Sequence, residues 1–111
     1  MSRTRNPASA DAAALFAALG DETRLRLVRR LSHDGPMSMV RLTAGASVTR
    51  QAIAKHLRVM QAAGLVRCAK HGRENVWRLE QRRLQRTQRY LDTISKQWHA
   101  ALGRLQAFVE D

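Results

Sequence analysis

Apolar residues recur every three or four positions between residues 48 and 62, which predicts an amphipathic helix in the middle of the chain. Its buried face carries Ala52, Ile53, Leu57 and Met60, the spacing that one side of an α-helix presents to a core. Its other face is polar and basic, with Arg50, Gln51, Lys55 and Arg58. Ser47 or Thr49 is suited to cap the start of this helix, and Gly64 to end it.

The residues after this helix follow the pattern of a β-hairpin. A first strand begins with Leu65, Val66 and Cys68, and the returning strand carries Val76, Trp77 and Leu79. Between them, residues 70–75 make a polar turn around Gly72. The pattern therefore predicts a hairpin over about residues 65–79 with a basic tip.

Two helices are predicted in the N-terminal third of the chain. Residues 12–19 are nearly all apolar, so a helix there, capped by Ser9 or Asp11, needs another surface to cover it. A second helix at about residues 22–32 follows an N-cap at Asp21. Its predicted buried face holds Leu25, Val28 and Leu31.

A short third helix is expected at about residues 39–44, after a Gly-Pro break at 35–36 that leaves Met37 in an extended edge. Gly45 makes the turn into the helix at 48–62. Two helices joined by such a short turn form the unit that places a recognition helix in the major groove of DNA.

A long helix is predicted over about residues 82–108, with apolar residues close to a heptad repeat. Leu84, Leu91, Trp98 and Leu105 are seven apart, and Thr87, Ile94, Ala101 and Phe108 take the companion positions. This is the seam of two packed helices. The seam either covers the chain's own core or joins two copies, and we favour a homodimer because so small a domain has little apolar surface to offer. The expected interface residues are Phe16, Leu19, Leu91, Ile94, Trp98 and Leu105.

The expected fold is mainly α with a small β-hairpin (α+β): a winged helix-turn-helix with N- and C-terminal dimerisation helices. The 111 residues suit one domain, over residues 11–111, behind a flexible tail at residues 1–10 that is free to touch DNA phosphates. The start of the chain lacks the apolar segment of a secretory signal, so we expect a cytoplasmic protein.

Charge points to a polyanionic partner. Twenty Lys and Arg stand against nine Asp and Glu, for a formal net charge of +11. Within residues 37–79, eight basic residues stand against one acid, Glu74, which leaves +7 on the predicted reading unit. The alternative is a charged surface that is merely solvated, and we favour a surface that binds a polyanion. A membrane partner is not expected, because no segment approaches the roughly 20 apolar residues of a span.

Double-stranded DNA is the expected partner. Arg50 and Gln51 stand where a recognition helix meets base edges, whereas Lys70 and Arg73 belong beside phosphates. The full set of expected DNA-binding residues is Ser47, Thr49, Arg50, Gln51, Ala54, Lys55, His56, Arg58, Lys70 and Arg73.

Three segments together resemble the ArsR/SmtB-type winged-helix repressors. They are FAALGDETRLRLVRRLS at 16–32, VTRQAIAKHLRVMQAAGLV at 48–66 and HGRENVWRL at 71–79. The resemblance implies a dimeric prokaryotic regulator, usually a repressor, that binds a palindromic operator. At Ala54 similar proteins usually carry Ser or Thr, and a methyl group there offers only an apolar contact, such as one with thymine.

Many members of that family respond to metals, but the ligands for a metal are not found here, and no cofactor is expected. The predicted third helix lacks paired cysteines, and Asp92 and His99 on the long helix have no close companions. The single Cys68 is either a buried strand residue or, beside Arg67 and Lys70, a redox-active thiol. No catalytic constellation appears, so the protein is not expected to be an enzyme.

Two functions from different classes remain after this search: an operator-binding repressor and a nucleoid-type protein that coats DNA with little sequence preference. Arg50 and Gln51 favour the repressor, because both make bidentate contacts with bases. A metal- or thiol-responsive repressor is a variant of the first reading. A winged-helix module for protein interaction is disfavoured by the +7 charge. The effector, the operator and the regulated genes are not predicted.

Overall fold

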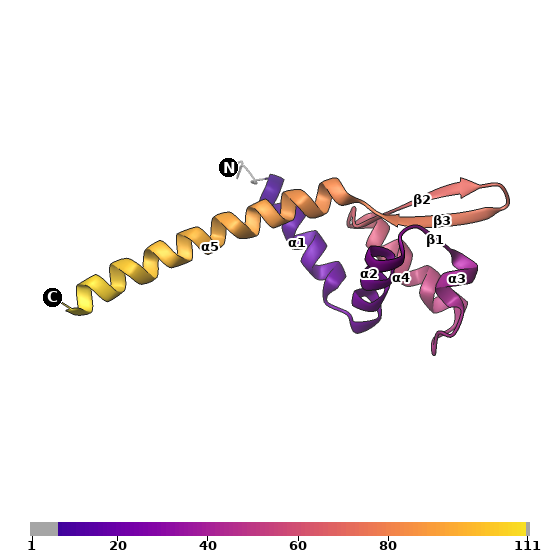
Figure 1. Ribbon diagram of the computed structural model, residues 1–111, viewed down its shortest axis with the longest axis horizontal. Helices are drawn as coiled ribbons and strands as arrows, with labels where there is room; N and C mark the ends of the chain where they lie inside the picture. The colour runs from indigo at the N-terminus through magenta and orange to yellow at the C-terminus, as the bar shows by residue number, and fades with distance from the viewer. Residues whose placement is uncertain (1–6, 111) are drawn as a thin grey trace, which may run out of the picture.

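The computed structural model describes residues 7–110, which form five helices and three strands. They follow in the order α1 (Pro7–Leu19), α2 (Glu22–Asp34), β1 (Met37–Ser38), α3 (Met39–Thr43), α4 (Arg50–Ala62), β2 (Val66–His71), β3 (Glu74–Leu79) and α5 (Gln81–Glu110). Figure 1 shows α2, α3 and α4 gathered beside the hairpin, with α5 running away from them. The mainly α fold with a small sheet is thus confirmed.

The sheet has three antiparallel strands in the order β1-β3-β2. β2 and β3 form the predicted hairpin, with Cys68 opposite Trp77 and His71 opposite Glu74, so the turn is confined to residues 72–73. β1 adds to the outer side of β3, with Met37 opposite Trp77. The extended edge expected at Met37 is therefore a true strand, and it ties the segment before α3 to the hairpin.

One hydrophobic core lies between the helices and the root of the hairpin. Its fully buried side chains include Leu15 of α1, Met37 of β1, Leu42 of α3, and Leu57 and Met60 of α4. Ile53 of α4 and Trp77 of β3 also belong to it. At about 25 cal/mol per Å² of buried apolar surface, such side chains supply most of the stabilisation of the domain. Every element of the helix-turn-helix and the hairpin root contributes to this core, so they hold one another in place.

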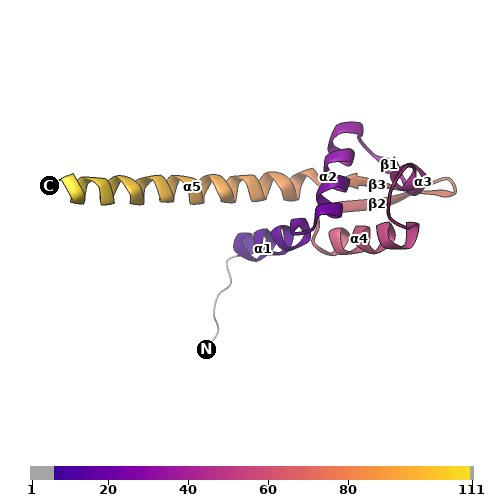
Figure 2. The same cartoon turned by 90° about the horizontal axis from the view of Figure 1, so that it is seen from below.

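α5 is the longest element, and most of it lies outside this core. Its first turns pack beside α1, while the remainder extends alone (Figure 2), which gives the molecule extents of 66 × 36 × 20 Å. Thr87 is the one buried residue among the thirty of α5. Within the described residues, no helix has the length and apolar character needed to span a bilayer.

The structure corrects several boundaries. α1 begins at Pro7 rather than near residue 12, so residues 7–10 belong to a helix and not to the predicted tail; residues 1–6 of that tail lie outside the described residues. α2 ends at Asp34, two residues later than predicted. α5 also exceeds its predicted bounds at both ends.

The buried face of α2 differs from the prediction. Leu27 and Leu31 are buried, whereas Leu25 is 44% exposed. Asp21 occupies the N-cap position with an extended backbone, but its side chain makes no capping hydrogen bond. It is instead drawn toward α4.

Candidate nucleic-acid interface

The helix-turn-helix consists of α3, a six-residue connection and α4. Ser38 caps α3 by accepting a hydrogen bond from the Arg41 backbone N–H. Arg30 of α2 donates to the carbonyl oxygens of Arg41 and Leu42, both at 3.1 Å, and so satisfies acceptors at the end of α3. These contacts fix α3 against α2, and α3 in turn supports the connection into α4.

Thr49 begins α4. Its hydroxyl oxygen accepts a hydrogen bond from the Ala52 backbone N–H at 3.1 Å. Between the two capping residues that the sequence allowed, the structure thus selects Thr49 rather than Ser47. No acidic side chain lies in the first turn of α4, so its positive helix end is left available to an anion such as a DNA phosphate.

The outward face of α4 is polar and basic, as predicted from its periodicity. Arg50, Gln51, Lys55 and Arg58 are all exposed, while Ile53, Leu57 and Met60 are buried on the opposite face. Ala54 is half-buried between the two faces. Burial of one face in the core fixes the direction in which the arginines, the lysine and the amide are presented.

The hairpin supplies a second basic surface. Lys70 is exposed near the end of β2, and Arg73 is exposed in the two-residue turn that joins it to β3. The hairpin tip reaches past the end of α3, away from α5 (Figure 1). The structure therefore places these two cations apart from the α4 residues, on a separate projection.

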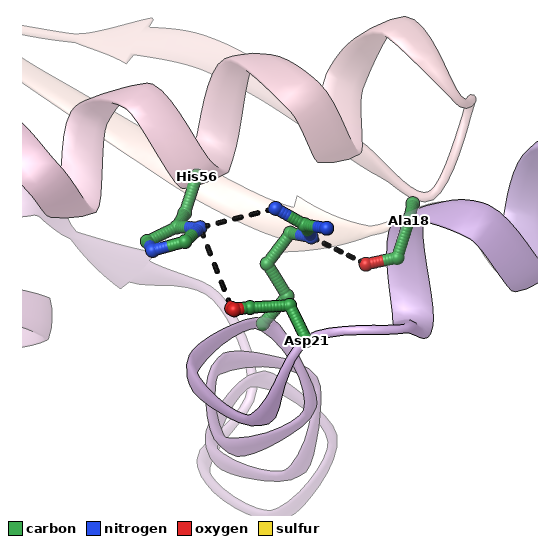
Figure 3. A network of polar contacts seen from close by, with 4 residues as sticks. Ala18, Asp21 and His56 are labelled. Carbon is green, nitrogen blue, oxygen red and sulfur yellow. Dashed lines mark hydrogen bonds and ion pairs between the residues drawn. The ribbon is translucent and has the colours of Figure 1, made fainter.

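His56 lies elsewhere than the other expected DNA contacts. Its side chain is 24% exposed and faces α2. Arg24 approaches the ring Nδ1 through Nη1 at 3.3 Å and also donates to the Ala18 carbonyl oxygen (Figure 3). Because arginine only donates hydrogen bonds, Nδ1 is the acceptor here. This role of His56 does not follow from the sequence, because helical spacing alone does not show which polar residue meets a neighbouring helix.

Asp21 completes this contact network between α1, α2 and α4. Its Oδ1 lies 3.9 Å from His56 Nδ1 (Figure 3) and is buried without a hydrogen-bond partner. α4 is thereby linked to the turn between α1 and α2. Neither Asp21 nor Arg24 was predicted to take part in such a link, and the short sequence GDETR offers only a capping signal.

The described residues contain no group of three or more His, Cys, Asp or Glu side chains placed to hold a metal ion. Asp92 and His99 are exposed on the free part of α5. Cys68 is half-buried on β2 with a free thiol. Among residues 7–110 of one chain, these side chains therefore do not converge on a common point.

The expected interface residues divide into two groups. Leu19 packs against the chain's own core. The others are exposed: Phe16 42%, Leu91 44%, Ile94 41%, Leu105 59% and Trp98 63%. An apolar surface of this extent on two adjacent helices is unusual for a monomer.

Comparison with known proteins agrees with this architecture. A family model described as a helix-turn-helix domain matches residues 19–69. The HTH-type transcriptional regulator YuzN of Bacillus subtilis is 42% identical over 69 residues, which cover 57% of this chain and 75% of YuzN.

Solved structures give the same result over more of the chain. An ArsR-like transcriptional regulator from Rhodococcus sp. RHA1 is 39% identical, with a TM-score of 0.81 over 90% of this chain and 93% of its own. The homodimeric winged helix-turn-helix DNA-binding domain of Mb0332 from Mycobacterium bovis shares the fold at 15% identity, with a TM-score of 0.64 over 86% of this chain and 91% of its own. With its exposed recognition helix and basic hairpin, the chain belongs to the ArsR family of winged helix-turn-helix transcriptional regulators.

Proposed function

We propose that the protein is a homodimeric repressor that binds a palindromic operator in double-stranded DNA. The observation that carries the proposal is the exposed basic and amide-bearing face of α4 at a helix end that Thr49 caps. In this reading α4 enters the major groove, where Arg50 pairs with guanine and Gln51 with adenine. Lys55, Arg58, Ser47 and Ala54 border the same surface.

Phosphate contacts position the protein rather than select the sequence. Lys70 and Arg73 on the hairpin supply such contacts beside the groove that α4 occupies. The Thr49 hydroxyl uses its oxygen for capping, and its hydrogen remains free to donate to a phosphate. His56 faces Arg24 and Asp21, so it supports the position of α4 and does not contact the bases in the groove.

The dimer is supported by the exposed apolar residues of α1 and α5. Trp98, Leu102 and Leu105 of α5 are 63%, 43% and 59% exposed. Figure 2 shows the C-terminal part of α5 extending away from the other elements. Pairing these side chains with a second copy removes this apolar surface from water, and each Å² buried stabilises the dimer by about 25 cal/mol. The Mb0332 domain, which shares this fold, is homodimeric. Two-fold symmetry in the protein then requires two-fold symmetry in the operator.

The second candidate is a nucleoid-type protein that coats DNA. The net charge of +11 favours it, because attraction between basic residues and phosphates does not depend on the DNA sequence. Capture of genomic fragments by the purified protein, followed by sequencing, separates the two. The repressor predicts a few sharp sites with a shared inverted repeat, whereas the coating protein predicts diffuse recovery.

The Arg50→Ala variant is the matched control for this capture experiment. It should lose the sharp sites and keep the diffuse background, because it removes a base contact while most of the charge remains. Sharp sites that persist unchanged in Arg50→Ala would show that another surface selects the sequence. A reporter gene placed downstream of the recovered site then tests repression. A repressor predicts that expression of the reporter rises when the protein is absent.

A further inference from the structure

An open cavity of about 630 Å³ lies where the end of α4, the start of β2 and the first turns of α5 meet. Figure 1 shows these three segments near the root of the hairpin. Its wall includes Arg67, Glu80, Arg82, Arg83, Arg86 and Cys68. Four guanidinium groups thus surround one opening together with a single carboxylate. The cavity lies at the Gly64 end of α4, about 20 Å along the helix from Thr49 at 1.5 Å per residue. It is therefore separate from the proposed DNA-binding face.

The charges around the cavity are only partly compensated. Arg67 Nε lies 3.1 Å from Glu80 Oε2, and Arg83 Nη1 lies 3.0 Å from Asp11 Oδ1 of α1. Arg86 reaches the second Asp11 oxygen at 4.0 Å. Within residues 7–110, Arg82 has no carboxylate at ion-pair distance. Two carboxylates thus face four arginines, so an excess of positive charge remains at one opening.

Arg83 is held in an unusual position. Its guanidinium lies against the backbone of Gly64, so close that a Cβ on that glycine would stand 2.8 Å from the guanidinium carbon. Its Nε is buried and has no hydrogen-bond acceptor among the described residues. An arginine confined in this way keeps a donor unused while its outer edge faces Asp11 and the cavity.

We propose that this cavity binds a small organic phosphate, such as a mononucleotide or a sugar phosphate. A phosphate monoester carries about −1.5 to −2 charges at pH 7, which matches the uncompensated charge at the opening. The arginine fork binds phosphate oxygens bidentately. Arg82 and Arg86, both exposed, are the first contacts. The organic part then lies over Gly64, Val66 and Cys68.

The bound phosphate competes with Asp11 for Arg83 and Arg86. When it takes the guanidinium groups, α1 loses its ion pair with α5. Because α1 and α5 form the proposed dimer surface, the ligand then acts on the arrangement of the two copies; this consequence rests on the proposed function, whereas binding itself does not. The site would make the protein responsive to a phosphorylated metabolite.

The single cysteine gives a site-specific test, because Cys68 lines the cavity and any thiol signal comes from it alone. The full-length protein, without DNA, is alkylated with uncharged iodoacetamide in the presence of adenosine monophosphate, glucose 6-phosphate, inorganic phosphate or adenosine. The two organic phosphates should slow alkylation in a saturable manner, and adenosine should not. Equal protection by adenosine, or no protection by either organic phosphate, would overturn the proposal.

Two matched pairs of variants distinguish this cavity from general attraction to a basic protein. The Arg82→Gln/Arg86→Gln double variant should raise the ligand concentration needed for half-maximal protection by at least about tenfold, which is the contribution of a single charge-assisted contact. Arg89→Gln/Arg104→Gln removes the same charge from α5 outside the cavity and should change little. Equal weakening in both would refute the site.

Removal of the competing carboxylate should have the opposite effect. Asp11→Asn frees Arg83 and Arg86, so the organic phosphate should bind more tightly than in Glu110→Gln, which loses the same charge at the far end of α5. A weaker effect in Asp11→Asn than in Glu110→Gln would overturn the competition. Protection is measured as the ratio of rates with and without ligand within each variant, so changes in intrinsic thiol reactivity cancel. Operator binding is assayed separately, and its failure would leave the alkylation result intact.

Discussion

Single residues on α4 take different roles because the helix has a fixed inner and outer side. Arg50, Gln51, Lys55 and Arg58 are exposed, so they are free for a partner. His56 is turned toward Arg24 and Asp21, so it holds the helix in place. A polar residue on a recognition helix is thus not automatically a contact with DNA.

Arg50 and Arg73 should respond differently to removal of the side chain. Arg50→Ala should cost about 1–3 kcal/mol per half-site on the operator and much less on random DNA, because the variant no longer reaches a base. Arg73→Ala should weaken both DNAs about equally. It should also reduce the slope of log affinity against log salt by roughly one for each phosphate that is no longer neutralised.

Affinities measured on operator and random DNA at several salt concentrations check this pair. Each variant serves as the control for the other, since both remove one arginine. If Arg50→Ala weakens the two DNAs alike while Arg73→Ala alters the preferred sequence, the roles of helix and hairpin are reversed. If neither variant changes binding, the DNA-binding surface lies elsewhere.

Among the elements, those with strong periodicity were predicted well. The helix at 50–62, the hairpin and the long C-terminal helix follow from apolar spacing, glycine positions and the absence of proline. α1 already includes residues 7–10 and with them the predicted cap Ser9, and a proline at residue 7 is compatible with the first turn of a helix. For α2, apolar residues at 25, 27, 28 and 31 allow two buried faces, and only packing against the other helices selects Leu27 over Leu25.

The end of α4 provides a test of packing between elements. Gly64 and Gly45 both have positive φ, at 76° and 70°, but of these two only Gly64 has a side chain against it. Gly45→Ala should cost about 1 kcal/mol from backbone strain alone. Gly64→Ala should cost clearly more, because Arg83 must also move away from Asp11. Urea unfolding of both variants measures the difference in the free energy of unfolding. Equal losses would show that the contact between Gly64 and Arg83 does not contribute to stability.

The free part of α5 is the second element with a testable role. Trp98→Ala should weaken the dimer by about 3–5 kcal/mol if the ring is fully buried between two copies. Gln97→Ala, one residue earlier, removes a polar side chain from the same exposed helix and is the control. Sedimentation equilibrium at micromolar concentration decides the matter. A wild-type protein of monomer mass would exclude the interface altogether.

At the scale of the whole molecule, the placement of metal-binding side chains determines which metal ions the protein responds to. Zinc, cadmium and arsenite should not release operator DNA at concentrations near that of the protein, because the described residues offer no converging ligand set. A gel-shift titration with each ion tests this. Stoichiometric release would reveal a site that a single chain does not show, such as one formed by Asp92 of one protomer and His99 of its partner.

Sequence and structure differ most where distant segments meet. The contacts of Arg24 with His56, and of Arg83 with Asp11, join residues 32 and 72 positions apart. No local pattern encodes them, because they depend on how α1, α2 and α5 are placed in three dimensions. The cavity beside Gly64 could not be predicted for the same reason: its arginines are scattered between residues 67 and 86 and converge only in the fold.

The two-residue strand β1 has a mechanical consequence. It pairs with the central strand of the sheet and runs directly into α3, so the hairpin and the helix-turn-helix form one stiff unit. A signal cannot easily bend this unit, whereas the packing of α1 on α5 rests on fewer buried groups. In a dimer, regulation would then alter the separation of two unchanged reading units. The two copies of α4 bind both half-sites of the operator only when their separation matches the half-site spacing of about 34–36 Å. A change in that separation would therefore lower operator affinity.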